Sequence, residues 1–162
     1  MSTSATLVTL ALGTNLGDRA GLLATARVLV EARIGPIVAA SSELENPAWG
    51  LTDQPDFLNQ VIVVRYGLTP PPLRPQLHRL LDLTQAIELE LGRTRKQHWG
   101  PRSCDVDIVF VGDLRYEDER LSLPHPWWRE RDFVGGLIQR ELYPLLQATT
   151  PVQLLPAPAV QP

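Results

Sequence analysis

Two aspartates separated by one residue, Asp105 and Asp107, carry the clearest chemical signal in the sequence. They begin the short apolar run Asp105–Val111, which predicts a strand. Side chains two residues apart on a strand point to the same side, so both carboxylates share one face. Neighbouring carboxylates repel each other unless a cation lies between them. Mg²⁺ suits such a pair, because it binds one or two carboxylates together with phosphate oxygens. Two solvated charges at a strand edge remain an alternative.

The opposite side of this strand is predicted to face the core. It carries Cys104, Val106, Ile108 and Phe110, which are all apolar or weakly polar. Cys104 is the only cysteine, so the chain has no internal disulfide, which fits a reducing cytoplasmic setting. We expect a small buried apolar residue at this position rather than a nucleophile.

A basic segment precedes the aspartates. It contains Arg93, Arg95, Lys96, His98 and Arg102. Arginine and lysine bind phosphate oxygens and stabilise charge that shifts during phosphoryl transfer, so the segment favours a Mg-nucleotide site. Its tryptophan could stack on a planar ring or cover the core. A solvated basic loop is the alternative.

Two further segments hold candidate binding residues. In the first, Trp49 and Phe57 offer apolar walls, and Asn59 could hydrogen-bond the edge of a heterocycle. The second contains His125, one of three histidines, with Arg120, Arg129 and Arg131 nearby. Taken singly, these are also ordinary loop and core residues.

The elements that would position these residues follow from apolar periodicity and from turn residues. Strands are expected over Thr6–Leu12, Ile37–Leu44, Phe57–Tyr66 and Asp105–Val111. Helices are expected over Ala20–Arg33, from an entry at the prolines 70–72 to Gly92, and after a loop within His125–Glu141. Loops are expected over Gly13–Asp18, Glu45–Asp56 and 93–104. The order is β-α-β-β-α-β with a helical end. Because Glu45–Asp56 joins two strands without a helix, we expect an α+β fold with a mainly antiparallel, ferredoxin-like sheet rather than a doubly wound one.

Length and composition favour a single catalytic domain over residues 1–162, with a proline-rich tail over about 150–162. The net charge of -3 shows no basic excess that would indicate nucleic acid. We expect no membrane segment, because the apolar runs are far shorter than the ~20 residues that span a bilayer. The apolar N-terminus lacks a basic region and a cleavage site, so no signal peptide is expected.

Together the motifs resemble the 6-hydroxymethyl-7,8-dihydropterin pyrophosphokinase family of folate biosynthesis. The matching segments are Leu12–Asp18, Asp53–Asn59, Ile87-Glu88 with Gly92-Arg93, Trp99–Arg102 running into Asp105–Ile108, and Leu123–Pro126 with Arg131 and Phe133. They follow the family order over residues 7 to about 145. The resemblance implies a ferredoxin-like core with helices packed on the sheet in α/β/α layers and flexible catalytic loops. It also implies transfer of pyrophosphate from ATP to the pterin hydroxymethyl oxygen, with release of AMP.

The resemblance also implies residue roles. Asp105 and Asp107 would bind two Mg²⁺ ions, and Arg93 and Arg102 would complete the catalytic set. ATP, the co-substrate, would be contacted by Gln85, Glu88, Lys96, Arg120 and His125. The pterin would be contacted by Asn46, Pro47, Trp49, Phe57, Asn59, Trp99, Arg131 and Phe133, with its ring between Phe57 and Phe133.

Some positions depart from the family pattern: Asn46 stands where threonine is common, and the segment between Arg93 and Trp99 is about one residue shorter than in some members. The expected partners are small molecules, and the expected state is a monomer. Two other functions stay open: a metal-dependent phosphohydrolase that uses the aspartates to activate water, and a non-catalytic nucleotide- or pterin-binding module.

Overall fold

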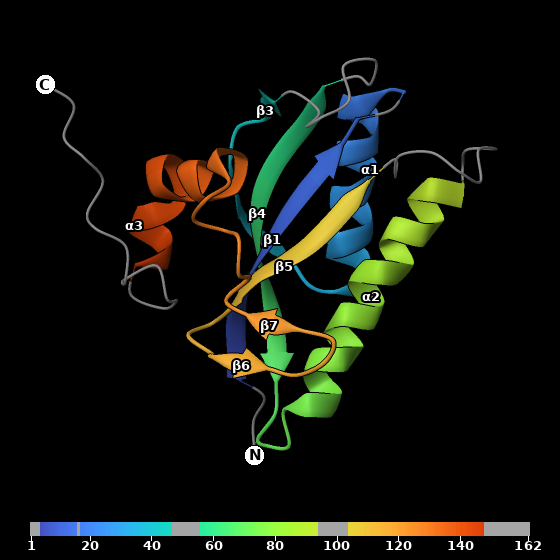
Figure 1. Ribbon diagram of the computed structural model, residues 1–162. Helices are drawn as coiled ribbons and strands as arrows, with labels where there is room; N and C mark the ends of the chain where they lie inside the picture. Colours follow the sequence, from blue (N-terminus) through green and yellow to red (C-terminus); the bar gives the residue numbers. More distant parts are fainter. Residues whose placement is uncertain (1–3, 16, 47–55, 94–103, 148–162) are drawn as a thin grey trace, which may run out of the picture.

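An antiparallel sheet lies at the centre of the molecule, with helices on both of its faces (Figure 1). The computed structural model describes residues 4–15, 17–46, 56–93 and 104–147. Its elements are β1 Ser4–Thr14, α1 Arg19–Arg33, β2 Ile37–Ala40, β3 Leu44–Asn46, β4 Phe57–Leu68, α2 Arg74–Arg93, β5 Asp105–Val111, β6 Tyr116–Glu117, β7 Ser122–Leu123, the π-helical turns η1 Asp132–Gly136 and η2 Ile138–Leu142, and α3 Tyr143–Leu146. The predicted α+β class is confirmed.

The strand order places β5 at one edge of the sheet. Within the described residues the order is β2-β4-β1-β5, with β3 added along β4. The longest pairing joins β1 to β4, from Ser4 opposite Leu68 to Thr14 opposite Leu58. All of these pairs are antiparallel. Apart from the added β3, this is the predicted ferredoxin-like arrangement.

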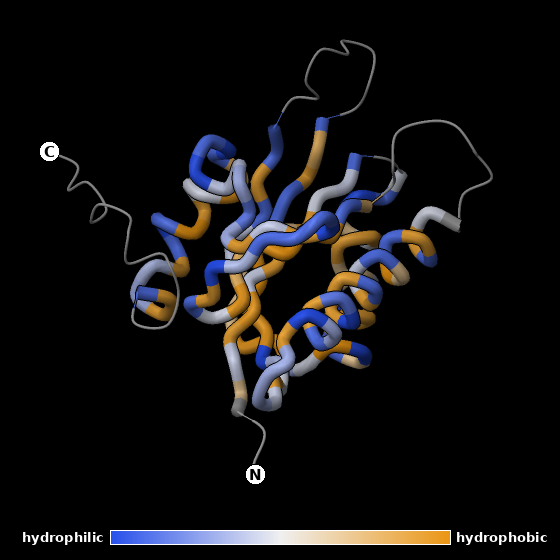
Figure 2. Tube along the Cα trace, turned by 60° about the horizontal axis from the view of Figure 1, so that its bottom comes forward, coloured by the Kyte–Doolittle hydropathy of each residue, from blue (hydrophilic) through white to orange (hydrophobic). Residues whose placement is uncertain are grey.

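The central strands are buried on both faces, which explains their continuous apolar runs. Along β4, Val61 and Val63 face the core beneath η1, η2 and α3, whereas Ile62 and Val64 face the core beneath α1 and α2. This alternation is the period-two geometry of a strand. Figure 2 shows apolar residues along the central strands and at intervals along both long helices. The three layers follow from burying both sheet faces.

Helix α1 begins and ends where the sequence predicts, to within one residue. The Asp18 carboxylate accepts a hydrogen bond from the Gly21 amide at 3.0 Å and caps the helix N-terminus. At the other end, the Gly35 amide donates to the Val30 carbonyl at 3.1 Å. A Cβ at Gly35 would lie 1.8 Å from the Arg65 carbonyl oxygen, so only glycine lets the chain pass this close to β4.

The single strand predicted over Ile37–Leu44 is wrong, because side chains interrupt the ladder and divide it into β2 and β3. The Ser41 hydroxyl accepts the Val61 amide at 2.9 Å, in place of a backbone carbonyl. One residue later, Glu141 accepts both the amide and the hydroxyl of Ser42, at 2.8 and 2.6 Å. Serine side chains that compete with the backbone in this way commonly end regular structure.

The prediction that the prolines at 70–72 form the first turn of the helix is wrong: α2 begins at Arg74 and ends one residue past Gly92. The Gln76 side chain closes the preceding turn instead. It accepts the Thr69 amide at 2.8 Å and donates to the Pro72 carbonyl at 2.9 Å. The backbone before Arg74 is therefore bonded to a side chain rather than wound into the helix.

The prediction that Phe110 shares a side with Val106 and Ile108 is also wrong. Thr9 pairs with Phe110 and Leu10 with Ile108, which leaves one extra residue in β5 between them. Such a β-bulge reverses the alternation of side chains beyond it. Phe110 accordingly packs edge-on against Trp128 in the core beneath η1, η2 and α3, with ring centroids 4.8 Å apart.

The C-terminal part departs furthest from prediction. The hairpin of β6 and β7 was not anticipated, and the helical turns start only at Asp132 and continue to Leu146. No helix in the described ranges is long and apolar enough to cross a membrane.

Candidate active site

A small pocket opens beside the carboxylate face of β5, and we call it the Phe57 pocket. It has a volume of about 130 Å³. Its walls come from β1, β3, β4, β5 and η1: Ala11, Leu12, Gly13, Asn46, Phe57, Asn59, Asp105, Asp107, Phe133 and Val134. Most of these residues belong to paired strands, so backbone hydrogen bonds fix the shape of the pocket. The walls combine two aromatic rings, two amides and two carboxylates.

The two amides of the Phe57 pocket are held together by strand register. β3 pairs with β4 so that Asn46 lies opposite Phe57. The Asn59 Nδ2 group donates to the Leu44 carbonyl at 3.1 Å and to the Asn46 Oδ1 atom. On the other side, a Cβ at Gly13 would lie 3.0 Å from Asn59 Oδ1, so glycine there gives the amide its space. Primary amides offer both donors and acceptors, which suits a polar heterocycle edge.

The aromatic walls come from distant parts of the chain. Phe57 begins β4, and Phe133 lies in η1. Arg131 is not itself part of the wall, but its guanidinium carbon lies 5.9 Å from the centre of the Phe133 ring. This is within the range of a cation–π contact, which orients that ring.

A larger cavity of about 360 Å³ lies between α2 and the edge strand, and we call it the Gln85 cleft. Its walls come from α2, β5, the β6–β7 hairpin and the following segment: Leu81, Thr84, Gln85, Glu88, Val106, Asp107, Ile108, Asp118, Glu119, Arg120, Leu121, Ser122, His125 and Pro126. The α2 residues recur at spacings of three and four, so they form one helix face.

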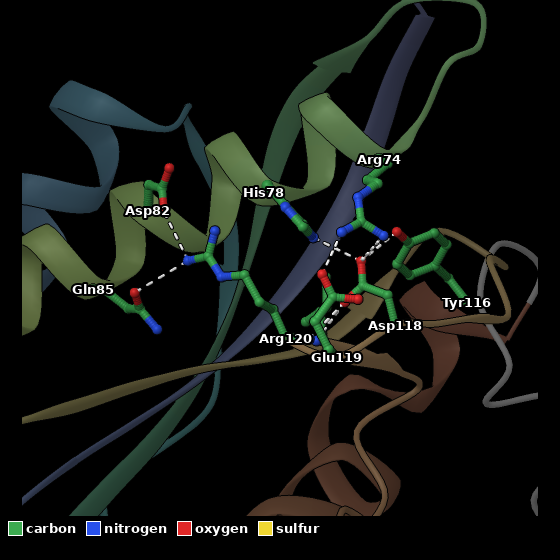
Figure 3. Close-up of polar contacts among 9 residues, drawn as sticks. Arg74, His78, Asp82, Gln85, Tyr116, Asp118, Glu119 and Arg120 are labelled. Carbon is green, nitrogen blue, oxygen red and sulfur yellow. Dashed lines mark hydrogen bonds and ion pairs between the residues drawn. The ribbon is translucent and has the colours of Figure 1, made fainter.

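Side chains, rather than strand pairing, hold the Gln85 cleft together. Glu88 Oε2 accepts the Val106 amide at 2.8 Å, which joins α2 to the exposed edge of β5. Across the cleft, Arg120 donates to Asp82 Oδ1 at 2.8 Å and to Gln85 Oε1 at 3.4 Å (Figure 3). The hairpin is thus connected to α2 by polar contacts.

His125 stands at the end of the Gln85 cleft. Its amide donates to the Val109 carbonyl at 2.9 Å, and its Nδ1 atom accepts the Trp127 amide at 3.2 Å. Burial lowers the pKa of His125, and Arg131 lowers it further, whereas Asp107 acts in the opposite direction. The neutral imidazole is favoured, and because Nδ1 accepts, its proton lies on Nε2, which can donate to a ligand.

Asp107 lies where the two cavities meet. Asp105 and Asp107 both line the Phe57 pocket, and Asp107 also lines the Gln85 cleft. Both are only partly buried, whereas Val106 between them is 3% exposed. Among the described residues, no group of three or more histidines, cysteines or acids could hold a metal by itself. A pair of carboxylates fits a hard divalent cation whose other ligands are phosphate oxygens and water.

The single cysteine is buried next to this pair, as predicted. Cys104 is 1% exposed. Burial, followed by the charge of Asp105, raises the pKa of its thiol to about 12. The thiol therefore stays protonated near neutral pH and is a poor nucleophile.

The structure gathers most of the described candidates around the two cavities. Asn46, Phe57, Asn59, Asp105, Asp107 and Phe133 line the Phe57 pocket; Gln85, Glu88, Asp107, Arg120 and His125 line the Gln85 cleft. Pro47, Trp49, Lys96, Trp99 and Arg102 lie outside the described residues, and Arg93 is the last residue of α2.

Sequence reasoning missed Thr84 and Ser122 in the wall of the Gln85 cleft. Thr84 had a usable signal, since it lies one turn before Glu88 and one turn after Leu81 on the same helix face. Ser122 lies in β7, which the sequence did not predict.

Comparison with known proteins agrees with this geometry. Residues 9–142 match the family described as 7,8-dihydro-6-hydroxymethylpterin-pyrophosphokinase, abbreviated HPPK. The chain belongs to the HPPK family. Proteins of this family transfer the pyrophosphoryl group of ATP to hydroxymethyldihydropterin in folate biosynthesis, so the resemblance seen in the motifs is confirmed.

Two relatives show the extent of the HPPK likeness. The 2-amino-4-hydroxy-6-hydroxymethyldihydropteridine pyrophosphokinase of Methylorubrum extorquens is 43% identical over 126 residues, which are 77% of this chain and 75% of the relative. The enzyme of the same name from Bacillus subtilis is 41% identical over 126 residues, which are 77% of this chain and 71% of the relative.

Solved structures support the fold. The HPPK-DHPS protein of Plasmodium falciparum, crystallised as wild type with SDX-DHP, aligns with a TM-score of 0.55 and 17% identity. The alignment covers 84% of this chain but only 40% of that one. At this identity the likeness concerns architecture alone, and it agrees with the layered α+β fold.

Proposed function

We propose that this chain carries out the HPPK reaction where its two cavities meet: the pyrophosphoryl group of ATP passes to the hydroxymethyl oxygen of 6-hydroxymethyl-7,8-dihydropterin, and AMP is released. The observation that carries the proposal is the position of Asp107. This carboxylate lines an aromatic, amide-bearing pocket on one side and a polar cleft on the other. A transfer between two substrates requires such a shared boundary.

Asp105 and Asp107 are proposed to hold two Mg²⁺ ions at this boundary. Their carboxylates extend from the same face of β5, and the bulge in β5 lies beyond them. When bound, Mg²⁺ neutralises the charge of phosphate oxygens and orients them for in-line displacement. The number of ions follows the family resemblance, and the carboxylate geometry supports the choice of metal.

The Phe57 pocket is proposed to take the pterin. Its ring would lie between Phe57 and Phe133, and its polar edge would meet the amides of Asn46 and Asn59. Strand register and Gly13 pre-organise these amides, so less freedom is lost when the ligand binds. Arg131 supports the Phe133 ring, and Pro47, Trp49 and Trp99 are proposed to complete the site.

The Gln85 cleft is proposed to take ATP. Gln85 and Glu88 would contact the nucleotide from α2, Arg120 from the hairpin, and His125 through its Nε2 proton. Arg120 is already oriented by Asp82 and Gln85. Arg93, Lys96 and Arg102 are proposed to bind the phosphates and stabilise charge that develops during transfer.

The transfer is proposed to be direct. The hydroxymethyl oxygen forms a bond to the β-phosphorus as the bond to the AMP oxygen breaks, and the hydroxyl proton is released to solvent, so no side chain becomes phosphorylated. The buried, protonated thiol of Cys104 agrees with this, because the one cysteine beside the aspartates is not available as a nucleophile.

We further infer that residues 1–162 act as one catalytic domain on these two small molecules, as a cytoplasmic monomer. The connected sheet supports the single domain, and the net charge of -3, without a basic excess, supports small molecules rather than nucleic acid as partners.

A direct assay tests the proposed activity. The protein is incubated with ATP, Mg²⁺ and 6-hydroxymethyl-7,8-dihydropterin, and the nucleotide products are separated. We expect AMP that depends on the pterin. ADP or free phosphate formed without pterin would instead indicate a phosphohydrolase, and nucleotide binding without turnover would indicate a non-catalytic binding module.

A further inference from the structure

Asp118 lies in the turn between β6 and β7, at one wall of the Gln85 cleft, and the proposed reaction gives it no role. Its side chain is only 6% exposed. Figure 3 shows it surrounded by donors from the hairpin and from α2, next to Arg120. A carboxylate this enclosed requires a physical explanation, because burial of a charge is costly unless it is paired.

One oxygen of Asp118 shapes the turn. Its Oδ1 atom accepts the Arg120 amide at 2.7 Å and the Leu121 amide at 2.9 Å. The Asp118 amide in turn donates to the Leu121 carbonyl at 2.9 Å. The backbone of the residues that line the cleft is therefore folded around this oxygen, in the manner of an Asx turn.

The other oxygen joins the hairpin to α2. Its Oδ2 atom accepts His78 Nε2 at 2.6 Å and the hydroxyl of Tyr116. Arg74 Nη1 lies 3.8 Å away and adds a positive charge from the same helix. His78 and Arg74 are one turn apart on α2, so they reach Asp118 from the same helix face.

The charge state of Asp118 agrees with this arrangement. The hydrogen bond from Tyr116 lowers the pKa of the carboxyl most, burial acts against it, and the Arg120 amide and His78 lower it again. Each of these donors favours the ionised form. The carboxylate thus accepts from both sides across the neutral pH range.

The hairpin is too short to hold its own shape. Its strands have two residues each, with Tyr116 opposite Leu123 and Glu117 opposite Ser122. An isolated hairpin is marginally stable even with longer strands. Leu121 and Leu123, which are 8% and 4% exposed, anchor it in the core. These apolar anchors keep the hairpin folded, but they do not fix the distance between its turn and α2.

We propose that Asp118 is a positioning residue for nucleotide binding: it holds the Arg120–Ser122 wall of the Gln85 cleft at a fixed distance from α2. This rests on the proposed function, which assigns the cleft to ATP. Asp118 acts through the backbone of Arg120 and Leu121, and Arg120 completes the bridge by donating to Asp82 and Gln85. Loss of Asp118 widens the wall and weakens ATP binding, while the Phe57 pocket across β5 is unchanged.

Two substitutions separate the two oxygens. Asp118→Asn keeps an acceptor for the turn but replaces the oxygen that binds His78 and Tyr116 with a donor, whereas Asp118→Ala removes both. Binding of an ATP analogue with a methylene between its α- and β-phosphorus is measured by calorimetry with Mg²⁺. We expect binding to weaken about threefold for Asp118→Asn and about tenfold for Asp118→Ala, in line with lost hydrogen bonds to a charged group. The KM for ATP should rise in parallel, with kcat and the KM for pterin within about twofold of the starting protein.

Glu90→Gln is the matched control. It removes a carboxylate from the same helix, where Glu90 pairs with Arg33 at 2.6 Å outside both cavities. Any general loosening of α2 would appear there, and we expect unchanged nucleotide binding. If Asp118→Ala does not fold, Tyr116→Phe and His78→Gln each remove one anchor and should still weaken analogue binding, by a smaller factor.

The outcomes separate this inference from the proposed reaction. If the starting protein binds the analogue but forms no AMP, the proposed reaction is wrong. The positioning role is then still tested by the binding measurements alone. A starting protein that forms AMP, with folded Asp118 variants that bind the analogue as it does, would overturn the positioning role. An equal loss of ATP and pterin binding in those variants would also overturn it.

Discussion

The two sides of β5 are built in different ways. On one side, the Phe57 pocket takes nearly all of its walls from paired strands, and its amides are fixed by backbone register. On the other side, the Gln85 cleft is formed by a helix, a short hairpin and a connecting segment. These parts are joined by side chains such as Glu88, Arg120 and Asp118.

The difference predicts how each side responds to substitution. Many backbone hydrogen bonds together fix the strand register, so the shape of the Phe57 pocket does not depend on any single side chain. A polar contact between separate elements has no such support, and its loss changes the distance between them. Single substitutions on the nucleotide side should therefore change nucleotide binding, with little effect on pterin binding.

The largest effect is expected at the residue that both sides share. Asp107→Asn keeps the shape of the side chain but removes the charge that a divalent cation requires. We expect kcat to fall by at least about 100-fold, which is typical for loss of a principal electrostatic group. Product analysis of AMP formation at saturating substrates measures this.

Asp113→Asn is the control for Asp107→Asn, since Asp113 is exposed just beyond β5. It should retain full activity. Near-normal turnover in a folded Asp107→Asn protein would show that the metal assignment is wrong and that the two cavities do not share a reaction centre.

A smaller and one-sided effect is expected in the Phe57 pocket. Phe57→Ala removes an aromatic wall, and we expect pterin binding to weaken by roughly 30-fold, from lost apolar contact and lost stacking. Binding of the ATP analogue should change by less than about twofold. Phe57→Leu keeps the apolar bulk but not the ring, so its affinity for pterin should lie between those of the starting protein and of Phe57→Ala. Equal losses for both ligands in titration calorimetry would contradict the separation of the two sides.

The sequence predicted the pocket side better than the nucleotide side. Residues on strands are found from alternation, and a single strand carries both aspartates, so Asp105 and Asp107 were placed on one face without knowledge of the fold. Phe57 and Asn59 lie at the start of a long apolar strand, so the sequence predicted that they lie at one end of the sheet. Their partner Asn46 was identified only by family resemblance.

The rest depends on contacts that local patterns do not encode. The bulge in β5 follows from pairing with Thr9 and Leu10, roughly a hundred residues earlier in the chain, and nothing in Val109 itself marks it. The hairpin escaped prediction because two-residue strands are too short for any alternation to appear. No local sequence pattern singles out Asp118, since its partner His78 lies on a separate helix.

A moderate effect is expected on the nucleotide side alone. Arg120→Gln keeps a polar side chain but removes the guanidinium that donates to Asp82 and Gln85 and that would face the proposed phosphates. We expect the KM for ATP to rise about fivefold to tenfold, with the KM for pterin unchanged. Arg140→Gln is the control, because Arg140 forms an exposed ion pair with Asp132 at 3.2 Å and lines neither cavity. A parallel rise in the KM for pterin would mean that the hairpin supports both sites.

The smallest effect concerns stability, and it tests whether the nucleotide side depends on charge. The folded protein lowers the pKa of Asp118 below the unfolded value of about 3.9. As pH falls through this range, the unfolded chain takes up the proton first, so the stabilisation is complete above about pH 5 and is lost progressively below it. Urea unfolding of the starting protein and of Asp118→Asn should therefore differ fully at pH 5, and the difference should narrow steadily as the pH falls below about 4. Asp113→Asn, which changes an exposed carboxylate, should show no such trend. If the difference for Asp118→Asn were the same at every pH, the turn would be held by shape rather than by the carboxylate charge, and the contrast between the two sides of β5 would lose its electrostatic basis.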